Sequence, residues 1–354
     1  MAAQSIEKST IAQALGKVPK YKADANDAAA NDRLAVADLL TGVEIELEDW
    51  QGGGDNEDVY LPKYWTEHEE GSLRNGREFV LHPPRNGGKV TTAIDQFFAY
   101  GATWNPSERA SVHVHLDMLN GATVAGFRAM FTLFYALEGA IYRVADENRK
   151  WASYSCPLID MRADRLSAIL AATTHAGFKR GLVGDYHEEK YYGFNSVSLS
   201  KHGTIELRYF PCTTNKATLL SWINLCQELY SAAIELDVPT LAQHVRDLGV
   251  EQFIRTHLPR SADDLLAYVD AQEVMQRVAE CLAIYSDANV LKPIKRVAND
   301  ANLKSTAYAK LFNKMCAPIA ERERRKKEMD VVEIGVDELY LALLNQARNN
   351  NAGV

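Results

Sequence analysis

The stretch 42-GVEIELE-48 decides the fold of this chain, because after Gly42 its residues alternate between aliphatic side chains and glutamates. Side chains alternate along a β-strand, so this pattern predicts a strand with one apolar face and one acidic face. Neighbours on one face lie about 7 Å apart. Three carboxylates in such a row repel one another unless water or a cation screens them. Taken alone, the pattern is typical of an exposed edge strand. The apolar residues are Val43, Ile45 and Leu47, and the acidic ones are Glu44, Glu46 and Glu48.

Two further segments, 111-SVHVHLDM-118 and 204-TIELRYF-210, repeat this design with histidine and arginine among the polar residues. A single histidine is usually structural, but two on one strand face beside an aspartate form a set suited to divalent metals. Glu206 with Arg208 is either a surface ion pair or a metal ligand beside a phosphate-binding guanidinium. The apolar sides are Val112, Val114 and Leu116, and Ile205, Leu207 and Tyr209. The polar sides are Ser111, His113, His115 and Asp117, and Thr204, Glu206, Arg208 and Phe210.

A fourth segment, 77-REFVLHPP-84, places Glu78, Val80 and His82 on one face, and it follows the acidic turn 69-EEGSLR-74. Each segment alone has an ordinary explanation as a solvated strand or loop. Together they predict one sheet whose apolar face packs on helices and whose other face is concave and dense in hard-metal ligands. Such a face suits more than one Mg²⁺ or Mn²⁺ ion, since cations offset the charge repulsion. Paired ions beside Arg208 indicate phosphoryl-group chemistry.

The composition limits the class of protein. The chain has 354 residues and a net charge of -8, which suits one large domain or two ordinary ones and argues against nucleic-acid binding. Its five cysteines are scattered and form no CxxC motif. The most apolar run, 129–137, ends at Glu138, far short of a membrane span. We therefore expect a cytoplasmic protein with no membrane or nucleic-acid partner, in the host cytoplasm if phage-encoded.

The chain divides into three regions that differ in their sequence patterns. We expect a lead-in over residues 1–40, a catalytic core over 41–235 and a helical region over 236–354. Gly-, Pro- and Asn-rich clusters such as 83-PPRNGG-88 predict loops between the strands. The fold class is therefore α+β, a mainly antiparallel sheet with helices on one face. Apolar spacing predicts helices over 124–148, 164–176, 219–236, 241–248, 262–268, 271–285, 306–329 and 336–348.

The motifs GVEIE, EEGS with REFVLHPP, SVHVHLD, N-S-V-S-L and GTIELRYF occur in this order. This set resembles the putative amidoligase family, carboxylate–amine ligases of the glutamine synthetase and glutamate–cysteine ligase superfamily, often encoded by phages and bacteria. The resemblance covers about residues 40–235. It implies a curved antiparallel sheet that holds Mg²⁺ or Mn²⁺. On that sheet ATP phosphorylates a small-molecule or peptide carboxylate, and an amine then attacks the acyl phosphate to give an amide.

The resemblance also implies roles for single residues. Arg208 would contact phosphate and stabilise the transferring phosphoryl group, and His115 would help position the nucleotide. Arg149 and Asn195 occupy positions where the family often contacts substrate or phosphate. Many members have Asp at the place of Glu70, which leaves the ligand open between Glu69 and Glu70. The implied metal ligands are Glu44, Glu46, Glu70, Glu78, His113 and Glu206.

Several alternatives stay open at this level. A phage structural or accessory protein could keep the fold without activity, and a metal-dependent phosphohydrolase would use the same ligands with water as nucleophile. The base that deprotonates the incoming amine could be His82, His115 or Glu48. The aromatic residues Tyr186, Tyr191, Tyr192 and Phe194 would pack a loop on the sheet or line a substrate pocket.

Overall fold

The computed structural model describes residues 6–51, 63–100, 103–105, 107, 109–152, 154–184 and 190–286. The helices expected over 306–329 and 336–348, together with Tyr186 and Cys316, lie outside these residues. Four cysteines, Cys156, Cys212, Cys226 and Cys281, are buried.

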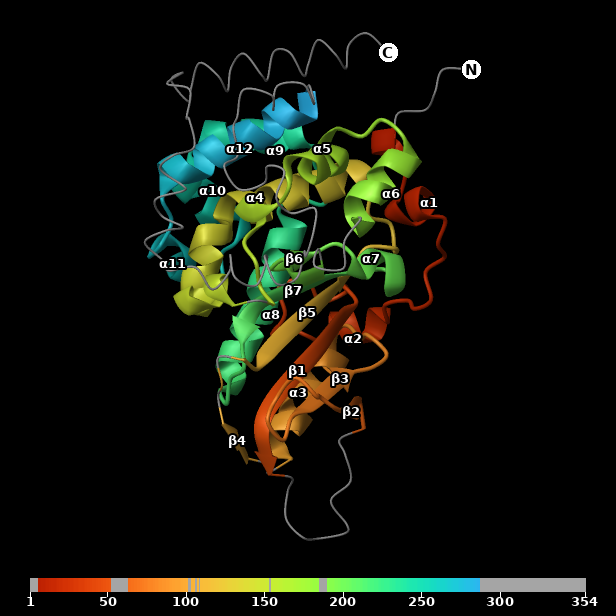
Figure 1. Ribbon diagram of the computed structural model, residues 1–354, viewed down its shortest axis with the longest axis vertical. Coiled ribbons are helices and arrows are strands. Elements are labelled where there is room, and N and C mark those ends of the chain that lie inside the picture. Colours follow the sequence, from red (N-terminus) through yellow and green to blue (C-terminus); the bar gives the residue numbers. More distant parts are fainter. Residues whose placement is uncertain are drawn as a thin grey trace, which may run out of the picture.

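The four alternating segments form neighbouring strands of one antiparallel sheet (Figure 1). The strand order is β2-β3-β1-β5-β7-β6, and β4 pairs with the far end of β1. The sheet is not closed into a barrel, and the predicted α+β class is confirmed. The strands are β1 Thr41–Gln51, β2 Trp65–Glu69, β3 Arg77–Leu81, β4 Thr103–Asn105, β5 Ser111–Asp117, β6 Phe194–Asn195 and β7 Thr204–Pro211.

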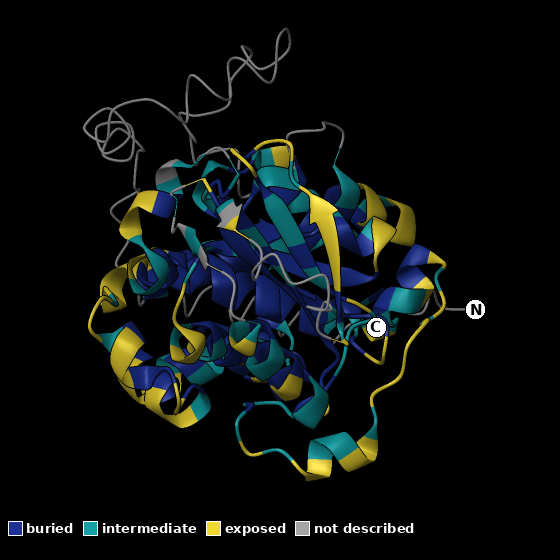
Figure 2. Ribbon diagram, turned by 90° about the horizontal axis from the view of Figure 1, so that it is seen from below, coloured by how far each residue is buried: buried dark blue, intermediate teal, exposed yellow. Residues whose placement is uncertain are grey.

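The apolar face of the sheet is buried as the alternation predicts. Helices α4 Val124–Ala145 and α8 Lys216–Ser231 pack against it, and α3 Gly87–Ala99 meets it through the ring of Phe97 against that of Phe79. Helix α8 also contacts both α3 and α4. Figure 2 shows the buried residues gathered in the centre of the molecule, with exposed residues around the rim. The other face of the sheet therefore remains available for the polar side chains. The buried strand residues are Val43, Ile45, Leu47, Phe79, Leu81, Val112, Val114, Leu116, Ile205, Leu207 and Tyr209.

Helix α4 is the central helix of the core. It is long and apolar enough to cross a membrane by length and composition, but 89% of its most apolar window is buried inside the protein. Glu138 lies within this helix rather than at its end, and its carboxylate accepts hydrogen bonds from the Leu158 backbone N–H and the Tyr209 hydroxyl. Internal hydrogen bonds thus allow one buried acid in an apolar helix.

A helical layer covers the far side of α4 and extends past residue 235 (Figure 1). The predicted helix over 164–176 corresponds to α5 Ala163–Ala171 and the first two residues of α6 His175–Val183, and helices α3, α7 Ser198–Lys201 and α10 Val250–His257 were not predicted. The remaining elements are η1 Ile6–Lys8, α1 Ile11–Leu15, α2 Ala25–Ala29, η2 Glu147–Trp151, η3 Leu158–Asp160, α5 Ala163–Ala171, α6 His175–Val183, α7 Ser198–Lys201, α9 Val238–Leu248, α10 Val250–His257, α11 Ala262–Leu266 and α12 Ala271–Ser286.

One continuous hydrophobic core joins the described parts of the chain. It contains residues from Ile6 near the start to Ile284 in α12. Helix α12 packs along α4, and α1 contacts both α4 and α6. Residues 6–40 and 236–286 therefore share one buried core with the sheet region between them.

Phe210 departs from the strict alternation predicted for β7. The register between β5 and β7 shifts between Val112 and Val114, and this irregularity changes the order of faces along the strand. Phe210 is fully buried and its ring stacks on Trp222 of α8, with ring centroids 5.0 Å apart. The prediction that Phe210 shares the polar side with Glu206 and Arg208 is therefore wrong.

Candidate metal and phosphate site

The strand register brings the polar residues of the four segments into rows across the sheet. Glu44 of β1 lies opposite His113 of β5, and Glu46 lies opposite Glu78 of β3. His115 lies opposite Glu206 of β7. We call this side of the sheet the polar face. It gathers residues that are up to 162 positions apart in the sequence, from Glu44 to Glu206.

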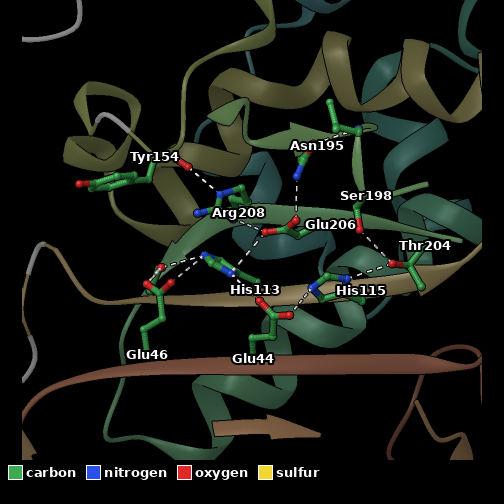
Figure 3. A network of polar contacts seen from close by, with 12 residues as sticks. Glu44, Glu46, His113, His115, Tyr154, Asn195, Ser198, Thr204, Glu206 and Arg208 are labelled. Atoms are coloured by element: carbon green, nitrogen blue, oxygen red, sulfur yellow. Dashed lines mark hydrogen bonds and ion pairs between the residues drawn. The ribbon is translucent and has the colours of Figure 1, made fainter. Parts of the chain in front are cut away.

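Glu44, His115 and Glu206 form the first group of possible metal ligands, which we call the inner cluster. One ligand atom of each lies within 4.8 Å of the others. His115 and Glu206 are buried, and the Glu44 side chain is 25% exposed. Glu44 Oε1 lies 3.2 Å from His115 Nε2. Figure 3 shows these side chains pointing toward one another from three adjacent strands.

Glu46, Glu70 and Glu78 form the second group, the outer cluster, with oxygen atoms that again lie within 4.8 Å of one another. All three residues are partly exposed. Glu70 follows β2, and its N–H donates to the Gly76 carbonyl across the turn. Its neighbour Glu69 is exposed and lies outside the cluster. Of the two glutamates that the sequence left open, Glu70 is therefore the one whose carboxylate joins Glu46 and Glu78.

His113 lies between the two clusters and is almost completely buried. Its Nδ1 is 3.1 Å from Glu44 Oε2 and 3.4 Å from Glu206 Oε1. On the other side its Nε2 is 2.8 Å from the Ser111 hydroxyl and 3.8 Å from Glu46 Oε1. One imidazole thus contacts carboxylates from both clusters.

Arginine and amide groups surround Glu206 on the β7 side of the polar face. Arg208 pairs with Glu206 through Nη1, and its Nε donates to the Tyr154 carbonyl at 2.9 Å. The Asn195 amide donates to Glu206 Oε2 at 2.7 Å. Arg149 comes from η2 and is buried, and its Nη2 is 3.5 Å from the Arg208 carbonyl. Two guanidinium groups therefore lie beside the acidic clusters.

Burial and charge shift the pKa values of these groups in opposite directions. Burial alone would raise the pKa of Glu44, but the charge of His115 and the hydrogen bond from His113 outweigh it and lower that pKa. Burial and the charges of Glu44 and Glu46 raise the pKa of Glu78 to about 7. For Arg208, burial is outweighed by Glu206 and Glu46, which raise its pKa, so the guanidinium stays charged.

Three residues that the sequence suggested as polar ligands or bases, Glu48, Asp117 and His82, lie apart from the two clusters. The Glu48 carboxylate has other partners: it accepts a hydrogen bond from the Arg74 N–H and lies 3.5 Å from Arg109 Nη1. Asp117 accepts hydrogen bonds from Asn120. His82 is exposed, and its ring contacts that of Tyr21 with centroids 6.2 Å apart.

Of the aromatic residues that the sequence singled out, Tyr192 and Phe194 are buried in the core. Tyr191 is partly exposed, and its ring meets that of Tyr154 with centroids 5.7 Å apart. The packing role therefore holds for Tyr192 and Phe194, whereas Tyr191 contacts Tyr154, whose carbonyl accepts a hydrogen bond from Arg208.

The structure adds residues that sequence reasoning did not select. Ser111 contacts Glu46 and His113, and Thr204 contacts His115. Both were visible on the polar side of the alternation, but hydroxyl groups carry no metal signature. His202 lies beside His115, with ring centroids 6.4 Å apart, and it precedes β7 where no periodic pattern marks it.

The donor set fits hard divalent cations. The outer cluster consists of three carboxylates, and the inner cluster of two carboxylates and one imidazole, which suit Mg²⁺ or Mn²⁺. Burial and the negative charges of Glu44 and Glu46 raise the pKa of Glu78, and positive charge nearby would offset the effect of those two charges. A bound cation would supply that charge.

Comparison with known proteins gives one finding. Residues 86–230 match the model of a family described as putative amidoligase enzyme, which indicates an enzyme of ligase type. No curated protein and no solved structure match the chain. The matched segment contains His113, His115, Arg149, Asn195, Glu206 and Arg208, and it begins after the strands that carry Glu44, Glu46 and Glu78.

Proposed function

We propose, from the premise that residues 86–230 belong to the amidoligase family, that this protein joins a carboxylate to an amine with ATP as the energy source. The observation that carries the proposal is the arrangement of two ligand clusters next to two arginines on one sheet face. An amide does not form readily from a free carboxylate in water, so the carboxylate must first be activated. Transfer of the ATP γ-phosphoryl group gives an acyl phosphate with a good leaving group.

Two divalent cations complete this site in the proposal. Glu44, Glu206 and a histidine would hold one cation, and the three glutamates of the outer cluster would hold the other. Both His113 and His115 lie within reach of Glu44, so the metal-binding role expected for His113 stays a proposal. When bound, such ions offset the charge of the ATP phosphates and of the substrate carboxylate.

Arg208 and Arg149 stabilise the transferring phosphoryl group in this scheme. The Arg208 Nε is fixed by the Tyr154 carbonyl and its Nη1 by Glu206, so the guanidinium is held before substrate arrives. Fixed charges at the place where charge develops lower the barrier without reorganisation. Asn195 orients Glu206 from the opposite side through its amide.

The amine must lose a proton before it attacks the acyl phosphate. Glu48 is a poor candidate base because Arg74 and Arg109 already engage its carboxylate. His82 is exposed near one end of β3, and His115 is buried in the inner cluster. Water as the nucleophile in place of the carboxylate and the amine would make the protein a phosphohydrolase, so a requirement for an amine distinguishes the two reactions.

The test is release of phosphate from ATP with Mg²⁺ over a panel of amino acids and peptides, with amide products detected by mass spectrometry. We expect release that needs both a carboxylate and an amine. Glu70→Gln should lower the rate at least about tenfold, because it removes a charge from the outer cluster. Glu69→Gln is the matched control and should retain the parent rate, since Glu69 lies outside the cluster.

A second measurement needs no knowledge of the substrates. A ligand that binds only the folded state raises the melting temperature. ATP with Mg²⁺ should raise it in the parent but not in Glu46→Ala or Glu206→Ala. Phosphate release without an amine would point to the hydrolase, and no effect of ATP at saturating concentration would favour an inactive structural protein that keeps the fold.

A further inference from the structure

The His115 ring has neighbours on β1, on β7 and in the residues just before β7. Gly42 lies directly opposite it in β1, and a Cβ at Gly42 would be only 3.2 Å from the His115 Cβ. The absence of a side chain there leaves room for the imidazole. Nε2 lies 3.2 Å from Glu44 Oε1, close enough for an ion pair but not aligned for a hydrogen bond, and Nδ1 lies 3.0 Å from the Thr204 hydroxyl. The ring of His202 meets that of His115 edge to face.

The hydroxyl group behind His115 has its own buried partner. Thr204 Oγ1 lies 3.2 Å from Ser198 Oγ, and both residues are almost fully buried. Figure 3 shows the resulting chain from Ser198 through Thr204 to His115 and Glu44. Three elements contribute to it: Ser198 lies in α7, Thr204 begins β7 and His115 lies in β5.

A hydroxyl differs from the partner that usually orients a metal-binding histidine. The usual partner is a carboxylate or a backbone carbonyl, which only accepts hydrogen bonds and so fixes the proton on the ring nitrogen that faces it. A hydroxyl can donate or accept. Thr204 can accept from Nδ1–H while donating to Ser198, or accept from Ser198 while donating to Nδ1. Neutral His115 can then present either a lone pair or an N–H at Nε2.

We propose that Thr204, supported by Ser198, is a positioning residue that holds Nε2 of His115 toward Glu44 and lets this nitrogen serve either a cation or an anion. In the first arrangement Nε2 offers a lone pair to a divalent cation of the inner cluster. In the second it donates a hydrogen bond to Glu44 or to a phosphate oxygen. The proposal gains its purpose from the ligase function above, but its test needs neither ATP nor substrates.

The test compares two substitutions at Thr204. Thr204→Val removes the hydroxyl and keeps the shape, whereas Thr204→Ser keeps the hydroxyl. The first readout is the ¹⁵N resonances of the histidine ring nitrogens in the metal-free protein, with those of His115 identified by their loss in His115→Gln. In Thr204→Val the His115 Nδ1 resonance should shift away from its position in the parent. In Thr204→Ser it should stay close to the parent position.

The second readout is the affinity for Mn²⁺, measured by the paramagnetic signal of the free ion. Loss of a group that orients a metal ligand lowers metal affinity about 10- to 100-fold. We expect at least about a tenfold loss in Thr204→Val by the same reasoning, and an affinity within about twofold of the parent in Thr204→Ser. Ser198→Ala should change both readouts in the same direction, and Ser200→Ala, in the same short helix, is its control because the Ser200 hydroxyl donates to the Val197 carbonyl instead.

Unchanged His115 resonances in Thr204→Val would overturn the proposal, and so would equal losses in Thr204→Val and Thr204→Ser, which would show that only packing matters. If Thr204→Val does not fold, Ser198→Ala decides, since an unmoved Nδ1 resonance there also overturns it. If the parent binds no Mn²⁺, the metal centre and the proposed function fail. The ring resonances still judge the role of Thr204 in that case.

Discussion

Glu78 shows the cost of assembling three carboxylates at one place. Its pKa is raised to about 7 by burial and by the charges of Glu44 and Glu46. The unfolded chain has an ordinary glutamate pKa, so between about pH 4.5 and 7 the folded state binds more protons at this group. The contribution of Glu78 to stability is therefore lost as the pH rises through this window.

Glu78→Gln should remove that pH dependence in the metal-free protein. At pH 8 we expect the variant to be more stable than the parent by roughly 1 kcal/mol, a figure reduced for the partial exposure of Glu78 to solvent. Well below pH 4.5 the difference should vanish, because the carboxyl group is then protonated in both the folded and the unfolded state. Thermal melts in EDTA at a series of pH values measure it. A difference that stays constant with pH would contradict the assignment of this shift to Glu78.

Arg208 illustrates a residue whose shape matters as much as its charge. Its Nε and Nη1 reach two different acceptors, the Tyr154 carbonyl and Glu206. Lysine carries one nitrogen and cannot fill both roles. We expect Arg208→Lys to lower ATP-dependent product formation by about 10- to 100-fold, which is about 1.4 to 2.7 kcal/mol of transition-state stabilisation. Arg109→Lys, at an exposed position beside Glu48, should keep nearly the full rate.

At the scale of elements, α4 depends on one close approach. A Cβ at Gly126 would lie 1.8 Å from the Ile234 carbonyl oxygen, so the chain after α8 crosses the helix almost in backbone contact. Gly126→Ala should therefore destabilise the protein by about 1 to 3 kcal/mol. Gly139 lies in the same helix, and the nearest atom to its Cβ would be 3.7 Å away.

Gly139→Ala is thus the matched control for that substitution and should stabilise the protein by about 0.5 to 1 kcal/mol through helix propensity alone. Urea unfolding of the two variants side by side measures both effects. Equal changes in the free energy of unfolding of the two variants would show that the close approach of Ile234 does not exclude a side chain at residue 126.

The strands could be predicted from the sequence because alternation of apolar and polar residues indicates both that a segment is a strand and which side chains share a face. The apolar residues that alternation assigned to the core side of β1, β5 and β7 are all buried. Helix α3 was hidden because it begins at Gly87–Gly88, residues typical of loops, with Gly87 at a φ of 49° against the backbone of Asp27. Phe210 could not be placed, since a register irregularity depends on the partner strand.

The candidate site divides in the same way. Alternation placed Glu44 with Glu46 on one face of β1, and Glu206 with Arg208 on one face of β7, because it needs only the strand itself. The grouping of ligands into two clusters depends on which strands are neighbours and in what register, which no single strand encodes. The choice of Glu70 over Glu69 depends on the path of the turn after β2, so it too could be made only from the structure.

At the scale of the whole molecule, the helices beyond residue 235 belong to the core of the sheet region. Val278 and Leu282 of α12 are fully buried, and α12 packs along α4. A chain that ends at residue 235 would expose this face of α4 to water. We expect it to lose the cooperative thermal transition of the full chain, as followed by circular dichroism, and to bind a hydrophobic dye. A sharp transition in the shortened chain would show that residues 1–235 fold alone.

The alternation along β1 also limits how the gene can change. Each substitution from Val43 to Leu47 affects either the interior or the ligand clusters, since neighbouring codons specify opposite sides of the strand. A single codon inserted between Ile45 and Glu46 would exchange the two sides for part of the strand, burying carboxylates and exposing aliphatic residues. Two inserted codons would keep the parity. Between Glu48 and Gln51 the register already shifts, so an extra residue would be absorbed there. Variation in length should therefore be confined to the end of this strand, while the segment from residue 42 to residue 48 varies only by replacement.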